Sequence, residues 1–134
     1  ALARALSTLV ESDRCGQLWV LFGCGGDRDR GKRAEMGEVA CRFADRVVVT
    51  SDNPRSEVPH SIIEDILEGC GDCKPLVEVD RAAAIALAVS QAHAGDTLLI
   101  AGKGHETYQE VAGVRLPFSD ADHAAERLLQ RRAA

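Results

Sequence analysis

The 134-residue chain has no stretch of 18 apolar residues, and its N-terminus has neither the charged nor the apolar segment of a secretion signal. Because a membrane-spanning helix needs about 20 apolar residues, neither a membrane protein nor a secreted one is indicated, and we expect a cytoplasmic protein. The chain also has no run of basic residues, and its formal net charge is −5. Nucleic-acid-binding domains usually present a basic face, so nucleic acid is not an expected partner.

The cysteine pattern of a disulfide-stabilised or zinc-binding protein is missing as well. Five cysteines are an odd number in a chain with enough apolar residues to build a core, so we expect all five to be thiols. Cys70 and Cys73 have CxxC spacing, but they follow a helical pattern, whereas a redox pair sits at the start of a helix. A zinc site would need a second pair of ligands, so no metal site is predicted. A redox protein using Cys70 and Cys73 stays an alternative.

The overall composition is that of an ordinary folded protein, with 46% apolar and 28% charged residues. The chain contains no internal repeat, no low-complexity segment and no linker. Its length suits one hydrophobic core. We therefore expect residues 1–134 to form a single domain.

Apolar residues alternate along the chain between helical spacing and short continuous runs. Leu2, Leu6 and Leu9 repeat at helical spacing, and the continuous apolar run 18–22 follows them. The same alternation predicts strands at 47–49, 76–79 and 97–101 and helices at 36–43, 59–67 and 83–92. A hairpin is predicted from 108–111 and 114–118. Ser119 or Asp120 is expected to cap a last helix that ends near Leu129. Continuous apolar strands separated by helices are typical of a parallel sheet covered on both faces. The predicted fold is α/β, a Rossmann-like three-layer domain with a mostly parallel sheet and a C-terminal β-hairpin.

Polar or glycine-rich segments follow three of the predicted strands. They are 23–33 after the first strand, 52–55 after the second and 102–106 after the strand at 97–101. Ligands of open α/β sheets bind beyond the carboxyl ends of the strands, where loop amides and helix N-termini meet. We therefore expect these three segments to form one site.

The first segment resembles a nucleotide loop only in part. It departs from the Walker A pattern GxxxxGK[ST], because Arg33 stands where Ser or Thr would hold Mg²⁺. It also departs from GxGxxG, because Arg28 stands at the third glycine. A solvated turn with paired charges is the alternative interpretation of this segment alone.

The charges of the three segments are complementary to those of a free amino acid. Arg28 and Arg55 can each hold a carboxylate through two hydrogen bonds, while Asp52 and Glu106 can hold an ammonium group. Asn53 can donate and accept at once, which suits a zwitterion. Acid, amide and proline are also common turn formers, so a plain turn at 52–54 remains an alternative. The pattern predicts an amino-acid pocket.

Three motifs and their spacing identify a family. They are GCGGDRDRGKR at 23–33, DNPR at 52–55 and GKGHE at 102–106, and RLPFSD follows at 115–120. Together they closely resemble the C-terminal domain of the Mur ligases, in the branch that adds meso-diaminopimelate. The resemblance covers essentially the whole chain.

This resemblance implies an ATP-dependent ligase of peptidoglycan biosynthesis that adds meso-diaminopimelate to UDP-N-acetylmuramoyl-L-alanyl-D-glutamate. ATP activates the D-glutamyl carboxylate as an acyl phosphate, and the amine of the incoming amino acid attacks it. The resemblance assigns the diaminopimelate pocket to Arg28, Asn53, Arg55, Gly102 and Glu106, with Asp52 beside them. Arg55 is expected to hold the second carboxylate, which lysine lacks. Lys32, Arg33 and Asp27 are weaker candidates for residues that face a phosphate group.

The family's other two domains are not found in this sequence. The central domain carries the Walker A loop and holds most of the ATP and Mg²⁺ contacts, and the N-terminal domain binds the UDP end of the substrate. We therefore expect the isolated chain to be inactive. The alternatives are a stand-alone module that binds an amino acid or docks on a partner without catalysis, and a related ligase specific for lysine or glutamate.

Overall fold

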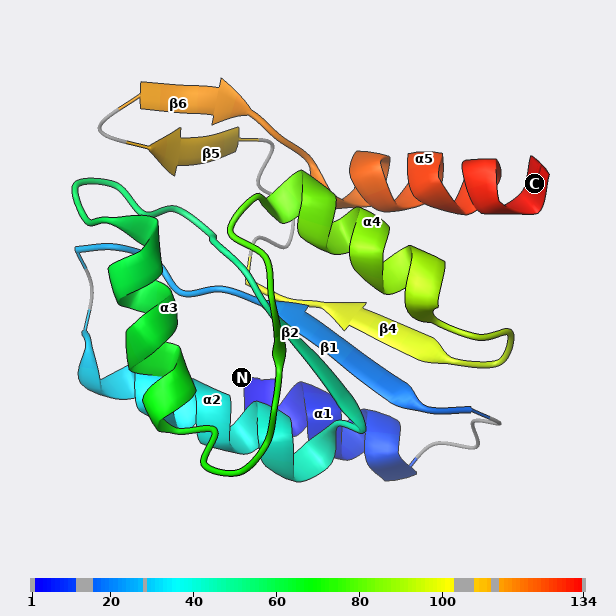
Figure 1. Ribbon diagram of the computed structural model, residues 1–134, viewed down its shortest axis with the longest axis horizontal. Coiled ribbons are helices and arrows are strands. Elements are labelled where there is room, and N and C mark those ends of the chain that lie inside the picture. Colours follow the sequence, from blue (N-terminus) through cyan, green and yellow to red (C-terminus); the bar gives the residue numbers. More distant parts are fainter. Residues whose placement is uncertain (1, 12–15, 28, 103–107, 112–113, 134) are drawn as a thin grey trace.

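The computed structural model describes residues 2–11, 16–27, 29–102, 108–111 and 114–133 (Figure 1). Its helices are α1 (Leu2–Glu11), α2 (Gly31–Phe43), α3 (Pro59–Glu68), α4 (Arg81–Gln91) and α5 (Asp120–Ala133). Its strands are β1 (Leu18–Phe22), β2 (Arg46–Val49), β3 (Leu76–Val77), β4 (Thr97–Ile100), β5 (Tyr108–Val111) and β6 (Val114–Pro117). None of the described helices is long and apolar enough to cross a lipid bilayer.

Four strands form one parallel sheet in the order β3-β2-β1-β4. Strands β5 and β6 form a separate antiparallel hairpin. The chain proceeds from β1 outwards to β2 and β3 and then returns to the other side of β1 to form β4. The strand order therefore reverses between β1 and β4, and such a point is the usual ligand position in this class of sheet.

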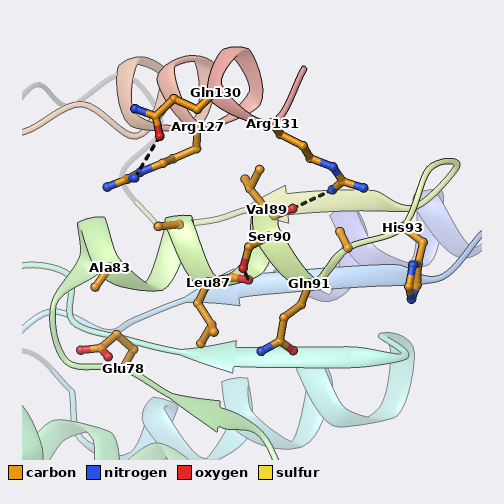
Figure 2. A pocket seen from close by; sticks show the side chains of 12 residues that line it. Glu78, Ala83, Leu87, Val89, Ser90, Gln91, His93, Arg127, Gln130 and Arg131 are labelled. Carbon is orange, nitrogen blue, oxygen red and sulfur yellow. Dashed lines mark hydrogen bonds between the residues drawn. The ribbon is translucent and has the colours of Figure 1, made fainter. Parts of the chain in front are cut away.

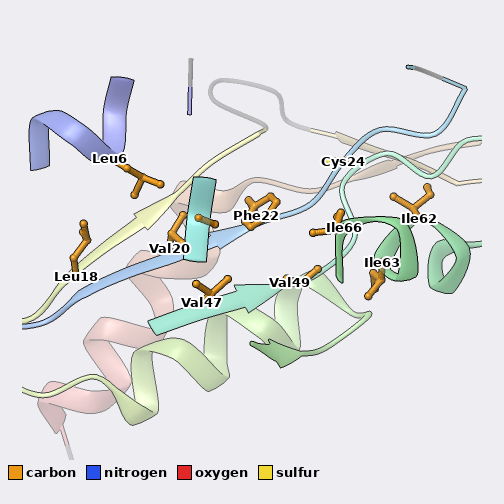
Figure 3. Close-up of a cluster of buried hydrophobic side chains, with 11 residues drawn as sticks. Leu6, Leu18, Val20, Phe22, Cys24, Val47, Val49, Ile62, Ile63 and Ile66 are labelled. Carbon is orange, nitrogen blue, oxygen red and sulfur yellow. The ribbon is translucent and has the colours of Figure 1, made fainter. Parts of the chain in front are cut away.

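Helices cover both faces of the sheet, as expected for three layers. Figure 1 shows α1, α2 and α3 on one face and α4 and α5 on the other. The side chains of β1 alternate between the two cores and are all buried: Leu18, Val20 and Phe22 join the first core (Figure 3), and Trp19 and Leu21 join the second. Burial on both sides is the reason why this strand is continuously apolar. The α/β prediction is confirmed.

Helix boundaries follow the predicted signals closely. Helix α3 begins at Pro59, where a missing backbone N–H costs nothing. The carboxylate of Asp80 accepts a hydrogen bond from the amide of Ala82 and caps α4. The hydroxyl of Ser119 accepts one from the amide of Asp122 at the start of α5. Two predicted ends were wrong, because α5 continues to Ala133 and the third strand stops at Val77.

The prediction of five thiols is wrong for one pair. Cys41 and Cys73 form a disulfide, with 6.0 Å between their Cα atoms. Helices α2 and α3 pack against each other and bring the end of α2 next to the turn after α3. Cys24 and Cys70 are buried thiols, and the CxxC residues are not joined to each other. The bond therefore does not follow the CxxC spacing that favoured the redox alternative.

Candidate functional site at the carboxyl edge of the sheet

The loops after β1, β2 and β4 meet at the carboxyl edge of the sheet. The amide of Gly26 donates to the carbonyl of Asn53 over 2.7 Å, and a methyl group built on Gly26 would lie 1.8 Å from the carbonyl oxygen of Pro54. Only glycine permits this approach of the first loop to the second. Gly102 has a φ of 112°, and a methyl group there would lie 3.6 Å from the Asp52 Oδ2 and from the Gly23 carbonyl oxygen. All three loops therefore contribute to one place.

A cavity of about 360 Å³ lies where the loops meet. Its wall is formed by residues of the three loops and of the first half of α2: Gly23, Cys24, Gly25, Asp29, Lys32, Arg33, Met36, Asp52 and Gly102. Lys32 is exposed in the first turn of α2, and Asp52 is almost buried. The cavity thus joins a cation, an acid and a helix N-terminus, which together suit a charged ligand.

A larger hollow of about 740 Å³ lies between α4 and α5, in a different part of the molecule (Figure 2). It is lined by the helix residues Ala83, Leu87, Gln91, Arg127 and Arg131 among others. None of the three loops contributes to it. We favour the smaller cavity as the candidate site because strand ends and a helix N-terminus converge there, whereas the larger one is an open groove between two helix surfaces.

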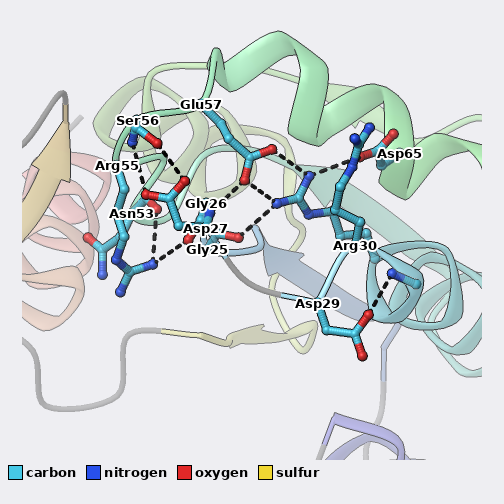
Figure 4. A network of polar contacts seen from close by, with 12 residues as sticks. Gly25, Gly26, Asp27, Asp29, Arg30, Asn53, Arg55, Ser56, Glu57 and Asp65 are labelled. Atoms are coloured by element: carbon cyan, nitrogen blue, oxygen red, sulfur yellow. Dashed lines mark hydrogen bonds and ion pairs between the residues drawn. The ribbon is translucent and has the colours of Figure 1, made fainter.

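Arg55, in the loop after β2, has an unusual backbone conformation. Its φ is 53°, and the other described non-glycine residue with positive φ is Asp27, at 55° in the loop facing it. Its Nη1 donates to the carbonyl of Gly26 over 3.0 Å and to that of Asn53 over 3.3 Å (Figure 4). Strained residues held by their surroundings are frequent at binding sites. The guanidinium is therefore positioned between the first two loops.

A buried arginine holds the first loop against the segment after DNPR. Arg33 is 1% exposed, and its Nη2 donates to the carbonyl of Gly25 over 3.2 Å and to Glu57 Oε2 over 2.7 Å. Its Nη1 donates to Glu57 Oε1 and to Asp65 Oδ2 over 3.1 and 2.9 Å. The amide of Asp27 in turn donates to Glu57 Oε2. Both Nη atoms of Arg33 are thus used by protein groups, and the assignment of Arg33 as a phosphate-facing residue stays a prediction.

This network shifts the pKa values of its members in the expected directions. The hydrogen bond from Arg33, followed by that from the Asp27 amide, lowers the pKa of Glu57 to about 2. Hydrogen bonds from Arg30 and Arg33 hold the pKa of Asp65 below its ordinary value. Both carboxylates are ionised at neutral pH, and the bonds to them raise the pKa of Arg33.

Cys24 lies in the wall of the cavity but is not a nucleophile at neutral pH. Burial raises the pKa of its thiol to about 11, and the Arg33 charge offsets only part of this. Its sulfur is 3.4 Å from the sulfur of Met36. A neutral thiol packed against a thioether has a packing role in the cavity wall and no role in covalent chemistry.

The residues predicted for the amino-acid pocket are only partly within the described chain. Asp52 and Gly102 lie in the cavity wall, and Asn53 is 2% exposed. Arg55 is not among the lining residues and donates to the carbonyl of Gly26, the residue after Gly25 of the wall. Arg28 and Glu106 lie outside the described residues, as does His105. Asp27 is exposed and accepts a hydrogen bond from the Ser56 hydroxyl, so its carboxylate joins the two loops. Lys32 is a candidate ligand-binding cation, because its side chain is exposed and lines the cavity.

Sequence reasoning missed a second buried arginine. Arg81 is completely buried and binds Asp120 and two loop carbonyls at this edge. The sequence feature that could have revealed it is a cation in the first turn of a helix. This is an unfavourable place, because it lies beside the positive end of the helix dipole. In the part of the chain that the structure describes, no three His, Cys, Asp or Glu side chains are arranged to hold a metal ion.

The fold and this edge define a Rossmann-like α/β domain that brings a charged pocket to the point where strand order reverses. The sequence profile described as "Mur ligase, glutamate ligase domain" matches residues 1–104. The chain therefore belongs to the Mur ligase family.

Relatives of known name cover almost the whole chain. It is 58% identical over 134 residues to the UDP-N-acetylmuramoyl-L-alanyl-D-glutamate–2,6-diaminopimelate ligase of Acidovorax sp. (strain JS42), covering 98% of the chain and 27% of that protein. It is 57% identical to the ligase of the same name from Neisseria meningitidis serogroup A, with the same two shares. A solved structure of a ligase with this name matches with a TM-score of 0.91 at 44% identity, covering 98% of the chain and 27% of that structure. The chain thus spans about a quarter of the length of these relatives.

Proposed function

We propose that this chain is the amino-acid-binding part of an ATP-dependent ligase that joins meso-diaminopimelate to UDP-N-acetylmuramoyl-L-alanyl-D-glutamate in peptidoglycan biosynthesis. Its relatives at 57 to 58% identity bear the name of that ligase over nearly the full length of the chain. The single structural observation that carries the proposal is the convergence of three loops on a cavity lined by Gly23, Asp52 and Gly102. Arg55 is held by carbonyls of two of these loops.

The chemistry of this edge suits a diamino dicarboxylic acid. Asp52 offers a carboxylate to an ammonium group, and Arg55 offers a guanidinium to a carboxylate. Lysine has no second carboxylate, so an Arg55 placed for that group would be left without its ligand partner in a lysine complex. We propose Arg28, Asn53, Gly102 and Glu106 as the remaining members of the pocket, as the family motifs imply.

The contribution of this chain to the reaction is to bind the amino acid and to present its amine. ATP supplies the phosphoryl group that activates the D-glutamyl carboxylate, and we propose that it is bound with Mg²⁺ mainly by other parts of the ligase. Of the chain's own residues, Lys32 at the start of α2 is the candidate to contact a phosphate group, because it is exposed and lines the cavity. Closure of the ligase around the amino acid would exclude water from the acyl phosphate.

The proposal is tested with the complete ligase that contains this chain. Phosphate release is measured with meso-diaminopimelate, L-lysine and D-glutamate as competing amino acids, and only the first is expected to support turnover. Arg55→Ala is expected to raise the KM for meso-diaminopimelate roughly tenfold or more, since a hydrogen-bonded charge contributes about 1.5–3 kcal/mol, while the KM for ATP stays unchanged. Turnover with lysine, or equal effects on both KM values, would contradict the assignment.

A further inference from the structure

One buried side chain connects two of the three loops that form the candidate site. The guanidinium of Arg81, the first residue of α4, donates to the carbonyl of Ser51 over 3.0 Å and to that of Ala101 over 3.1 Å. It also makes two hydrogen bonds of 2.7 Å with the two carboxylate oxygens of Asp120, at the start of α5. The loop after β2, the loop after β4 and α5 are therefore joined at one point.

The place of this arginine is costly by itself. A cation in the first turn of a helix lies beside the positive end of the helix dipole, and Arg81 is 0% exposed. Asp120, 7% exposed, supplies the opposite charge. Apolar residues of similar size often replace a buried ion pair without loss of stability, so folding alone does not require this pair. What an apolar pair cannot do is hold two carbonyl groups in a fixed relation.

The two carbonyls that Arg81 holds come directly before residues of the cavity. Ser51 precedes Asp52, and Ala101 precedes Gly102. These two cavity residues are neighbours in space, because a methyl group on Gly102 would lie 3.6 Å from Asp52 Oδ2. The planar guanidinium presents its donors in a rigid fork, so it sets the distance between the two loops.

We infer that Arg81 and Asp120 are positioning residues for amino-acid binding, which hold the start of the DNPR loop and the pair Ala101 and Gly102 after β4 in register without touching the substrate. This inference rests on the proposed function, since it assigns to the pair a share in the affinity for the amino acid. It concerns the loop after β2 and the loop after β4, whereas Arg33 connects the loop after β1 to Glu57 and α3.

Two variants of the complete ligase test the inference. Arg81→Lys keeps the charge but has a single nitrogen, which cannot reach both carbonyls and the carboxylate together. The double variant Arg81→Met/Asp120→Leu keeps the packing and removes the bridge. For both we expect the KM for meso-diaminopimelate to rise about tenfold, which corresponds to about 1.4 kcal/mol, with the KM for ATP and kcat within twofold of the unchanged enzyme.

Arg131→Lys is the matched control. The Nη1 of Arg131 donates to the carbonyl of Val89 over 2.6 Å, so this arginine also joins α5 to α4, but near the last turn of α4 (Figure 2). We expect no change in any KM. Amide hydrogen exchange of residues 50–57 gives a second readout that needs no substrate, and it should become faster in the two test variants and stay the same in the control.

The outcomes separate the two proposals. If the unchanged ligase does not use meso-diaminopimelate, the proposed function fails, whatever the exchange rates show. If it does use it, and the test variants keep its KM or raise all KM values equally, the positioning role is overturned. Should either variant fail to fold, Asp120→Asn, which keeps the shape of the pair but weakens its hold on Arg81, takes its place with the same expected rise in KM.

Discussion

The two edges of the parallel sheet use opposite charges for the same physical reason. At the amino edge, Asp45 Oδ2 accepts from the amide of Leu18 over 2.7 Å, and Asp96 Oδ1 accepts from the amide of Gln17 over 2.9 Å. At the carboxyl edge, arginines donate to loop carbonyls just past the strands. Parallel strands begin with unpaired N–H groups and end with unpaired C=O groups, so acids suit one edge and arginines the other.

The two edges differ in how their charged groups are used. At the amino edge, the carboxylate of Asp96 accepts hydrogen bonds from the amides of Gln17 and His93 and from the indole N–H of Trp19. The carboxyl edge has a cavity, an exposed lysine, and the two positive-φ non-glycine residues among those that the structure describes. The charged groups of the amino edge therefore terminate strands, and we propose that those of the carboxyl edge also bind a ligand.

The largest expected effect comes from removing the buried arginine of the first loop. Arg33→Met leaves Glu57, Asp65 and the Gly25 carbonyl without their shared donor, and we expect the free energy of unfolding to fall by about 2–3 kcal/mol. Urea denaturation followed by circular dichroism measures it. The control is Arg42→Met, since Arg42 is 66% exposed and forms an ion pair with Glu38 four residues earlier, which contributes at most about 0.5 kcal/mol. Equal costs for the two variants would contradict a structural role of the Arg33 network.

A smaller effect is expected from the amino edge. Asp96→Ala removes three hydrogen bonds, from the amide of Gln17 and the indole of Trp19 at the start of β1 and from the amide of His93 in the turn before β4. It should lower the urea midpoint less than Arg33→Met does, because water can reach this edge. The KM for meso-diaminopimelate in the complete ligase should not change. A rise in that KM would break the division between a structural edge and a binding edge.

Acid should weaken the carboxyl edge in a defined pH range. The pKa of Glu57 is lowered from 4.5 to about 2 in the folded protein, so its contribution is fully present above about pH 5 and is lost as the pH falls towards 2. Urea midpoints measured between pH 7 and pH 2 should fall less steeply in Glu57→Gln, which has no carboxylate to protonate. Parallel curves for the two proteins would show that Glu57 titrates normally.

The smallest expected effect concerns the backbone of Arg55. Both Arg55→Gly and Arg55→Ala remove the guanidinium, but only glycine adopts a φ of 53° without strain. The glycine variant should be more stable than the alanine variant by about 1 kcal/mol in urea denaturation. Equal stabilities would mean that the loop relaxes to negative φ once the hydrogen bonds of Arg55 to Gly26 and Asn53 are gone.

Much of the fold was predictable because its signals are local. The apolar run 18–22, the proline at the start of α3 and the aspartate cap of α4 each depend on residues adjacent in the sequence. The disulfide between Cys41 and Cys73 was not predictable, since it depends on how α2 packs against α3. The strand that begins at Leu76 was predicted too long. It is the edge strand β3, which pairs with β2 over only two residues.

The candidate site was predictable in its location and less so in its details. The loops after three parallel strands had to meet at one edge, and Asp52 and Gly102 do so. The roles of the arginines could not be predicted, because Arg33, Arg55 and Arg81 are the same residue type and differ only in their tertiary contacts. Arg33 lies among carboxylates, Arg55 donates to carbonyls of the first two loops, and Arg81 lies between two loops.

By itself the sequence determined the alternation of helix and strand, the parallel sheet and the family, because each depends on local periodicity or on motifs at fixed spacing. Only the tertiary structure decided which cysteines bond and which charged groups are used up inside the protein. The physical reason is burial: an arginine surrounded by fixed acceptors, as Arg33 and Arg81 are, is held by them, and only the packing of distant segments brings those acceptors together.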